Sequence, residues 1–238
     1  MTADEPLPLI DDAVPVVLPY DDVTLTGYAW WGEIQGPAFL LLHGWGEDAS
    51  TLAPVARQII NRGWHAVSIS MRGWRGSTGV DDYGLSAPRD IGRVLDWVRR
   101  QPLVESVVLL GFSMGGLMAG LAAAEQTELA GVVVVSSPSH LPTVYAQTAW
   151  GGVRRYFDET LKPQQWRESS PLTHAHKITH PMLIVTGLHD TMCPADQGRR
   201  MAAAVPKGRL LEISEMAHHP SPWEWERILD QAGRFIGL

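Results

Sequence analysis

Residues 107–119 have the sequence VVLLGFSMGGLMA. A run of branched apolar residues ends at Gly111, and Ser113 follows it with a glycine close on either side. Small residues then continue from Gly116 to Ala124, which is typical of a helix that packs close to another element. We therefore predict a strand, a sharp turn and a helix, with Ser113 at the tip of the turn.

Gly111 and Gly115 frame this serine in the pattern Gly-x-Ser-x-Gly, which is that of a nucleophile elbow. In such a turn the serine backbone is strained, and a side chain at either glycine would collide with the neighbouring turn. The hydroxyl would stand at a helix N-terminus, where backbone N–H groups favour developing negative charge. The pattern is short, so an ordinary Gly-Ser loop before a helix is the alternative.

Strands and helices alternate on both sides of this stretch. Apolar runs bounded by turn residues predict strands at 14–18, 23–31, 38–42, 64–69, 107–111, 131–135, 181–186 and 209–213. Helical spacing and caps predict helices at 51–62, 88–100, 116–124, 194–205 and 221–233. This alternation predicts an α/β protein with a mostly parallel, doubly wound sheet and an antiparallel hairpin where the chain enters the sheet.

The division into domains follows from the same pattern. The 238 residues suffice for one sizeable core. We expect a loose acidic tail over residues 1–13 and a single domain over residues 14–238. Residues 138–178 interrupt the alternation of strands and helices with polar, aromatic and Pro residues, and we expect a short cap or lid insertion there. Gly151 and Gly152 would allow this insertion to move.

Composition bounds the partners. The formal net charge of −7 argues against a nucleic-acid or anionic-membrane partner. The single cysteine, Cys193, excludes an internal disulfide and suits a reducing compartment. The N-terminus lacks the basic and apolar regions of a signal peptide, and no apolar run approaches a membrane span. We expect a cytoplasmic protein acting on a small molecule, while the sequence leaves its oligomeric state open.

Four predicted strand ends carry groups of chemical interest: Ser113, Asp190, His218 and the stretch His43-Gly44-Trp45-Gly46. Parallel strands bring their carboxyl ends to one edge of the sheet, so these groups should meet there. The order Ser, Asp, His is that of α/β-hydrolases, and the chain from about residue 14 resembles that superfamily. Its resemblance is to small serine esterases and to prolyl-oligopeptidase-type catalytic domains, the latter through the Arg72-Gly73 loop, residues 90–102 and Ser170-Pro171-Leu172.

The resemblance implies a role for each group. Ser113 would be the nucleophile, His218 the base that takes its proton, and Asp190 the carboxylate that orients the imidazole. The backbone N–H of Met114 would be one donor of an oxyanion hole, and the resemblance makes the N–H of Trp45 the other. We expect no cofactor and no metal. The loop that contains Arg72 departs from the common hydrolase pattern at Ser70 and Arg75, which leaves the detailed geometry of this loop open.

Several positions have rivals. Asp190 could instead cap a helix, with Asp196 as a distant alternative acid. His219 competes with His218, which is favoured because the small residue Ala217 precedes it. We expect His43 to be a structural hydrogen-bonding residue and Cys193 a buried small residue. A metal site is an alternative for His174, His176 and His180, but no set of carboxylates or cysteines accompanies them.

The substrate is less determined. Aromatic residues could shape an apolar pocket, or only cover the sheet edge; they are Trp74, Tyr145, Trp150 and Trp166, with Trp45, Tyr156 and Phe157 beside them. We expect a serine hydrolase that cleaves carboxylic esters of small or medium acyl groups through an acyl-enzyme. The alternatives are a peptidase or amidase of the prolyl-oligopeptidase type, a hydrolase of thioesters or carbon–carbon bonds, and a non-catalytic binding protein on this fold.

Overall fold

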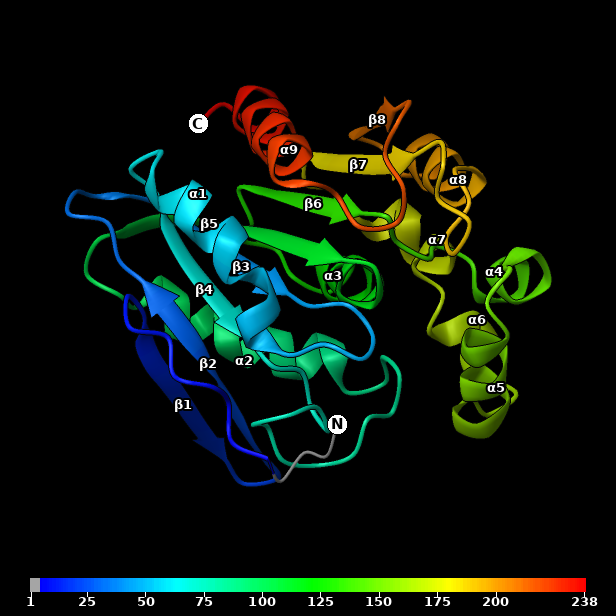
Figure 1. The fold of residues 1–238 in the computed structure, drawn as a ribbon, viewed down its shortest axis with the longest axis horizontal. Coiled ribbons are helices and arrows are strands. Elements are labelled where there is room, and N and C mark those ends of the chain that lie inside the picture. Colours follow the sequence, from blue (N-terminus) through cyan, green and yellow to red (C-terminus); the bar gives the residue numbers. More distant parts are fainter. Residues whose placement is uncertain (1–4) are drawn as a thin grey trace.

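The computed structural model describes residues 5–238, and Figure 1 shows their arrangement. Eight strands form one sheet, and their order across it is β1-β2-β4-β3-β5-β6-β7-β8. Their bounds are Val14–Tyr20 for β1, Val23–Trp30 for β2, Gly36–Leu42 for β3, His65–Ile69 for β4, Val104–Phe112 for β5, Gly131–Val135 for β6, Met182–Gly187 for β7 and Gly208–Ile213 for β8. Strands β3 to β8 run parallel, while β1 and β2 are antiparallel neighbours, so the predicted fold class is confirmed.

Helices cover both faces of the sheet (Figure 1). The helices before the cap segment are the 3₁₀ turn η1 (Ala49–Leu52), α1 (Ala53–Ile60), α2 (Ala87–Arg99) and α3 (Met114–Ala123). Those after it are α8 (Asp196–Ala204) and α9 (Pro222–Ile236). At the start of α9, the Glu224 carboxylate accepts a hydrogen bond of 2.6 Å from the N–H of Ser221, as the spacing of these two residues predicts.

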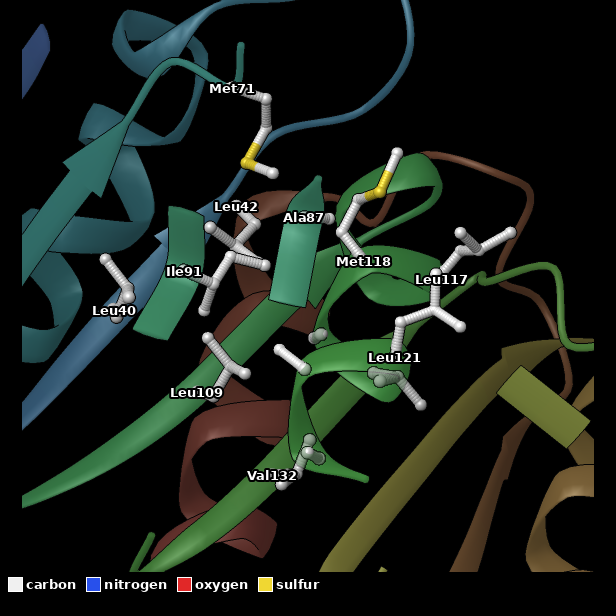
Figure 2. Close-up of a cluster of buried hydrophobic side chains, with 14 of the residues drawn as sticks. Leu40, Leu42, Met71, Ala87, Ile91, Leu109, Leu117, Met118, Leu121 and Val132 are labelled. Atoms are coloured by element: carbon white, nitrogen blue, oxygen red, sulfur yellow. The ribbon is translucent and has the colours of Figure 1, made fainter. Parts of the chain in front are cut away.

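The core forms two layers because successive side chains of a strand point to opposite faces. On β3, Leu40 and Leu42 face the layer under α2, α3 and α8, whereas Phe39 and Leu41 face the layer under α1 and α9. Figure 2 shows the first layer, in which Leu40, Leu42 and Leu109 of the sheet meet Ile91 of α2 and Leu117 of α3. The central strands are buried on both faces, which explains their almost unbroken apolar runs.

The segment between β6 and β7 holds four short helices and a 3₁₀ turn. They are α4 (Leu141–Gln147), α5 (Gly151–Thr160), α6 (Gln165–Glu168), α7 (Pro171–His174) and η2 (Ala175–Lys177). The sequence predicts only an insertion here, because helices of one to three turns are too short to show a clear period. In Figure 1, α4, α5 and α6 lie together on the right, beyond the carboxyl ends of β6 and β7.

The N-terminal stretch lies against the body. The predicted loose tail falls partly on residues 1–4, outside the described residues. From Glu5 to Ala13 the chain forms no helix or strand, yet it is held at several points. Tyr28 donates a hydrogen bond to the carbonyl of Pro8, and Asp12 accepts two from Arg57 at 2.7 and 2.8 Å. Within residues 5–238, no helix is long and apolar enough to cross a membrane.

Candidate active site

Ser113 occupies a strained turn between β5 and α3. Its φ of 51° and ψ of −116° are unusual for a residue with a side chain. A Cβ atom at Gly111 would lie 2.1 Å from the carbonyl oxygen of Gly115, and one at Gly115 would lie 2.1 Å from that of Leu42. Both glycines are therefore required by the close approach of backbone to backbone, as the elbow pattern predicts.

Gly115→Ala is expected to destabilise the fold by about 2–3 kcal/mol, because the new methyl group meets backbone that cannot move aside without shifting β3. The matched control is Gly152→Ala in the first turn of α5, where a Cβ would meet nothing within 4 Å. Urea denaturation of both variants measures the difference. Equal stability of the two variants would contradict the steric account of the elbow.

The three residues proposed as a triad form one hydrogen-bonded chain. His218 Nε2 lies 3.0 Å from Ser113 Oγ, and His218 Nδ1 lies 2.8 Å from Asp190 Oδ2. The other carboxylate oxygen of Asp190 accepts from the backbone N–H groups of Met192 and Cys193, both at 2.8 Å. With Nδ1–H donating to the carboxylate, Nε2 is left to accept the serine proton. Assignment of catalytic roles to these residues stays a prediction.

The burial of Asp190 corrects one expectation. Its place at a strand end predicts a side chain near solvent, but the Asp190 side chain is fully buried. The loop after β7 folds over it, since the N–H groups that it accepts belong to residues two and three positions further on. A buried carboxylate with both oxygens hydrogen-bonded is held in one orientation. Asp196, the alternative acid, lies at the surface, where it pairs with Arg200 at 2.6 Å.

Asp190→Asn is expected to lower kcat by about 10⁴ while the protein stays folded. The Asn oxygen would keep accepting from the two loop N–H groups, so its NH₂ would face His218 and force Nε2 to carry the proton. A histidine in that tautomer cannot take a proton from Ser113. The measurement is kcat together with the melting temperature. Asp196→Asn serves as the control. A collapse of kcat in Asp196→Asn, with near-normal kcat in Asp190→Asn, would assign the role of the triad carboxylate to Asp196.

Three other histidines lie outside the hydrogen-bonded chain of Ser113, His218 and Asp190. The His219 side chain is 64% exposed and lies 3.5 Å from a carboxylate oxygen of Glu47. His180 lies 2.7 Å from the carbonyl oxygen of Gln126, and His174 lies 3.0 Å from that of Glu168. Over residues 5–238, no three His, Cys, Asp or Glu side chains gather where they could hold a metal.

His43 is fully buried and makes two hydrogen bonds to backbone. Its Nδ1–H donates to the carbonyl of Gly44 at 2.8 Å, and its Nε2 accepts from the N–H of Met71 at 3.0 Å. These contacts link the turn after β3 to the loop after β4, which fits the structural role predicted for this residue. Burial lowers the pKa of His43 to about 4, because the protonated ring would lose its hydration.

This shift gives a prediction for stability in acid. The unfolded chain takes up a proton at His43 near its ordinary pKa of 6.5, whereas the folded chain does so only near 4. As the pH falls from 6.5 toward 4, the free energy of unfolding should therefore decrease by up to about 1.4 kcal/mol per pH unit from this group. His43→Gln keeps an acceptor for Met71 but cannot titrate. Urea denaturation of both proteins at pH 7, 6 and 5 should show the shallower dependence in the variant, and parallel curves would contradict the assignment.

The predicted oxyanion donors belong to two turns near the serine cavity. Met114 is the first residue of α3, and Trp45 belongs to a turn in which Gly46 has a φ of 80°. That turn is closed by two hydrogen bonds: the N–H of Glu47 donates to the Gly44 carbonyl at 3.3 Å, and the N–H of Gly44 donates to the Glu47 carboxylate at 2.8 Å. Trp45, Ser113 and Met114 all line one cavity.

This cavity has a volume of about 160 Å³ and opens beside the serine. Most of its surface is apolar. Besides Ser113 and His218, its wall includes the end of β5, residues of three loops and residues of the cap segment, among them Trp45, Tyr83, Phe112, Pro138, Val144, Trp150, Val153, Tyr156, Phe157, Met192 and Cys193. Burial raises the pKa of the Cys193 thiol, so this side chain is a neutral wall group and not a thiolate.

The predicted pocket residues are partly corrected. Trp150 lines the cavity, whereas Trp74, Tyr145 and Trp166 do not. Trp74 stands behind Trp45, with ring centroids 6.4 Å apart. Trp166 packs edge-on against Tyr145 at 5.2 Å and against Phe157 at 5.9 Å, so it supports the wall from outside. Aromatic composition alone cannot separate the first layer of a pocket from the layer behind it.

Tyr83 is one of the wall residues that sequence reasoning missed. It lies in the loop after β4 with a φ of 45°, and its ring packs 5.4 Å from that of Tyr156 and 5.1 Å from that of Phe157. The loop is tied to the cap segment because the Tyr156 hydroxyl donates to the carboxylate of Asp81. Burial raises the pKa of Asp81, which the hydrogen bond from Tyr156 opposes. Aspartates in polar loops rarely signal such a contact.

Comparison with known proteins places these observations among relatives. The model of the prolyl oligopeptidase family matches residues 59–217, about two thirds of the chain; the match includes Ser113 and Asp190 and ends one residue before His218. A dipeptidyl aminopeptidase BIII of Pseudoxanthomonas mexicana is 27% identical over 178 residues, which are 65% of this chain and 25% of that protein.

A second curated relative and one similar solved structure are esterases. A pimeloyl-[acyl-carrier protein] methyl ester esterase of Pseudoalteromonas atlantica is 28% identical over 120 residues, which are 50% of this chain and 43% of that protein. The chain thus spans less than half the length of either curated relative. An esterase of Pyrococcus furiosus superposes with a TM-score of 0.78 at 19% identity, covering 98% of this chain and all of that one, and this likeness concerns the fold.

Proposed function

Because the chain belongs to the prolyl oligopeptidase family, within the α/β-hydrolase superfamily, we propose that it is a serine hydrolase that cleaves carboxylic esters of small or medium acyl groups through an acyl-enzyme. The observation that carries the proposal is the hydrogen-bonded chain from Ser113 through His218 to Asp190 at the mouth of a mostly apolar cavity. A curated relative that is a methyl ester esterase and a structural neighbour that is an esterase support the proposal.

The reaction would proceed in two steps. In the first, Ser113 Oγ attacks the ester carbonyl carbon while His218 Nε2 takes the hydroxyl proton. The oxyanion would be stabilised by the N–H groups of Met114 and Trp45, each worth about 3 kcal/mol in the transition state. His218 then gives the proton to the departing oxygen. In the second step, water attacks the acyl-enzyme by the same route and Ser113 is regenerated.

The cavity supports an upper limit on the acyl group. About 160 Å³ accommodates a short acyl chain or one aromatic ring, and its mostly apolar wall would favour an uncharged group. Tyr83, Tyr156 and Phe157 line this cavity and their rings pack against one another, so a long acyl chain would have to displace side chains. We therefore propose short aliphatic or aryl acyl groups as the best substrates.

A peptidase is the second candidate, because the family is named for peptidases and one curated relative is a dipeptidyl aminopeptidase. The same three residues serve both reactions. They differ in the leaving atom, since an amide nitrogen must be protonated before it departs whereas an alkoxide leaves more readily. The geometry of Ser113, His218 and Asp190 is the same for an esterase and a peptidase, so activity on ester and amide substrates distinguishes the two functions.

The test is a panel of p-nitrophenyl esters from acetate to decanoate beside a panel of aminoacyl p-nitroanilides. We expect the highest kcat/KM for the short esters, a decline beyond the length that the cavity holds, and weak anilide cleavage. Anilide turnover comparable with ester turnover would favour the peptidase. Failure to label with a serine-directed fluorophosphonate would count against both and favour a non-catalytic protein.

The place of action is part of the proposal. The buried free thiol of Cys193 supports a reducing compartment, and we propose the cytoplasm. Fractionation of the native host, with a cytoplasmic marker enzyme followed in parallel, tests this. Recovery with an exported marker would reject it.

A further inference from the structure

A second cavity lies directly beside the first. Its volume is about 180 Å³, and it shares Glu47, Phe112 and His219 with the cavity at the serine. The rest of its wall comes from η1, from α1 and from the start of α9: Thr51, Leu52, Pro54, Val55, Gln58, Pro220, Pro222 and Trp225. Helices α1 and α9 cover the same face of the sheet in Figure 1, and this cavity opens between them.

The position of this second cavity near His218 indicates which part of a substrate it would hold. The departing atom of a substrate must approach His218 Nε2 to receive its proton, so the leaving group extends past this ring. His219 is the next residue, and its ring packs 5.2 Å from that of His218. Because His219 lines both cavities, the second cavity is the neighbouring space that a leaving group extending past His218 could occupy.

The polar atoms of this second cavity are mostly acceptors. Glu47 is the one residue of its wall with a fixed charge, and its side chain is 16% exposed. One carboxylate oxygen of Glu47 accepts from the Gly44 N–H, and the other lies 3.5 Å from the exposed His219 ring. Gln58 donates through Nε2 to the Pro222 carbonyl at 2.9 Å, while its Oε1 is buried without a partner among the described residues.

We propose that this second cavity binds the leaving group of the substrate and that Glu47 selects leaving groups that carry a positive charge. The inference rests on the proposed serine hydrolase function. A cationic group seated there would face the Glu47 carboxylate, with Leu52, Val55 and Trp225 as apolar walls. Ammonium groups are well matched to such a mixed site because they interact with both carboxylates and aromatic faces.

The proposal concerns the acylation step alone. There the bond from Ser113 Oγ to the acyl carbon forms, the bond from that carbon to the leaving oxygen breaks, and the serine proton passes through His218 to that oxygen. The leaving group is then gone, so deacylation is the same for all esters of one acid. Selection by the second cavity should therefore appear in kcat/KM and vanish from kcat when deacylation limits turnover.

The experiment compares two butyrate esters whose leaving groups have similar shape, 3-(trimethylammonio)phenol and 3-tert-butylphenol. The ratio of their kcat/KM values is measured for the wild type and for Glu47→Gln, which keeps an acceptor for the Gly44 N–H but removes the charge. We expect the variant to lower this ratio roughly three- to fivefold, as removal of a partly exposed ion pair does. Comparing ratios between proteins cancels the different intrinsic reactivity of the two esters.

Two further variants complete the test. Glu105→Gln removes a carboxylate at the start of β5, outside both cavities, and should leave the ratio unchanged. Thr51→Trp should fill the second cavity and lower kcat/KM for both aryl esters relative to methyl butyrate. An unchanged ratio in Glu47→Gln, or an equal loss in Glu105→Gln, overturns the role of Glu47. Turnover of neither ester by a wild type that also fails to label with fluorophosphonate overturns the proposed function as well.

Discussion

Ser113→Ala is expected to lower kcat by about 10⁶ on any ester that the native protein hydrolyses, because no other group can form the acyl-enzyme. The fold should be retained. Among residues 5–238, the Ser113 hydroxyl makes its side-chain hydrogen bond with His218, and alanine tolerates the backbone of this turn about as well as serine does. The measurements are kcat, fluorophosphonate labelling and the melting temperature of the purified variant.

Ser136 offers a matched control. It also follows a central strand, has a φ of 49° and is buried, but its hydroxyl has no hydrogen-bond partner among the described residues. Ser136→Ala therefore changes a serine in a similarly strained position without touching His218. We expect near-normal turnover and labelling. Residual activity of Ser113→Ala within about tenfold of the native protein would remove Ser113 from the mechanism.

His218→Ala should cost about as much as the loss of the serine, roughly 10⁶ in kcat, because serine and histidine act as a unit. His219→Ala should cost far less, although the two residues are neighbours in the chain. The reason is geometric: His218 reaches both Ser113 and Asp190, whereas the His219 ring points toward Glu47 and solvent. Kinetics on p-nitrophenyl butyrate measure both variants.

A reversed order of these two losses would falsify the assignment of the base and place it at His219. The pH–rate profile gives a second readout. His219→Ala should retain the native dependence of kcat/KM on pH, since the titrating base is untouched. Loss of that dependence in His219→Ala, with retention in His218→Ala, would contradict the geometry.

Much of the site was readable before folding because its parts have local causes. The positions two residues before and two residues after Ser113 must be glycine because a side chain there would collide with nearby backbone, so the pattern appears in a short stretch of sequence. Apolar runs predict buried parallel strands, and parallel strands bring Ser113, Asp190 and His218 to one edge. The burial of Asp190 was not readable, since it depends on how the next loop closes over the carboxylate.

The amino-acid sequence alone determined the sheet, the turn around Ser113 and the order of Ser113, Asp190 and His218 along the chain. Strand periodicity and glycine sterics act over short distances, so a local stretch of sequence records them. Tertiary packing settled which aromatic rings face the cavity. Trp74 and Trp166 ended behind it, while Tyr83 reached its wall through the contact between Asp81 and Tyr156, 75 residues apart. The same holds for Glu47, which stands between two cavities only because α1 and α9 meet on one face of the sheet. Side-chain direction at such meetings depends on partners distant in the chain, and no local pattern records it.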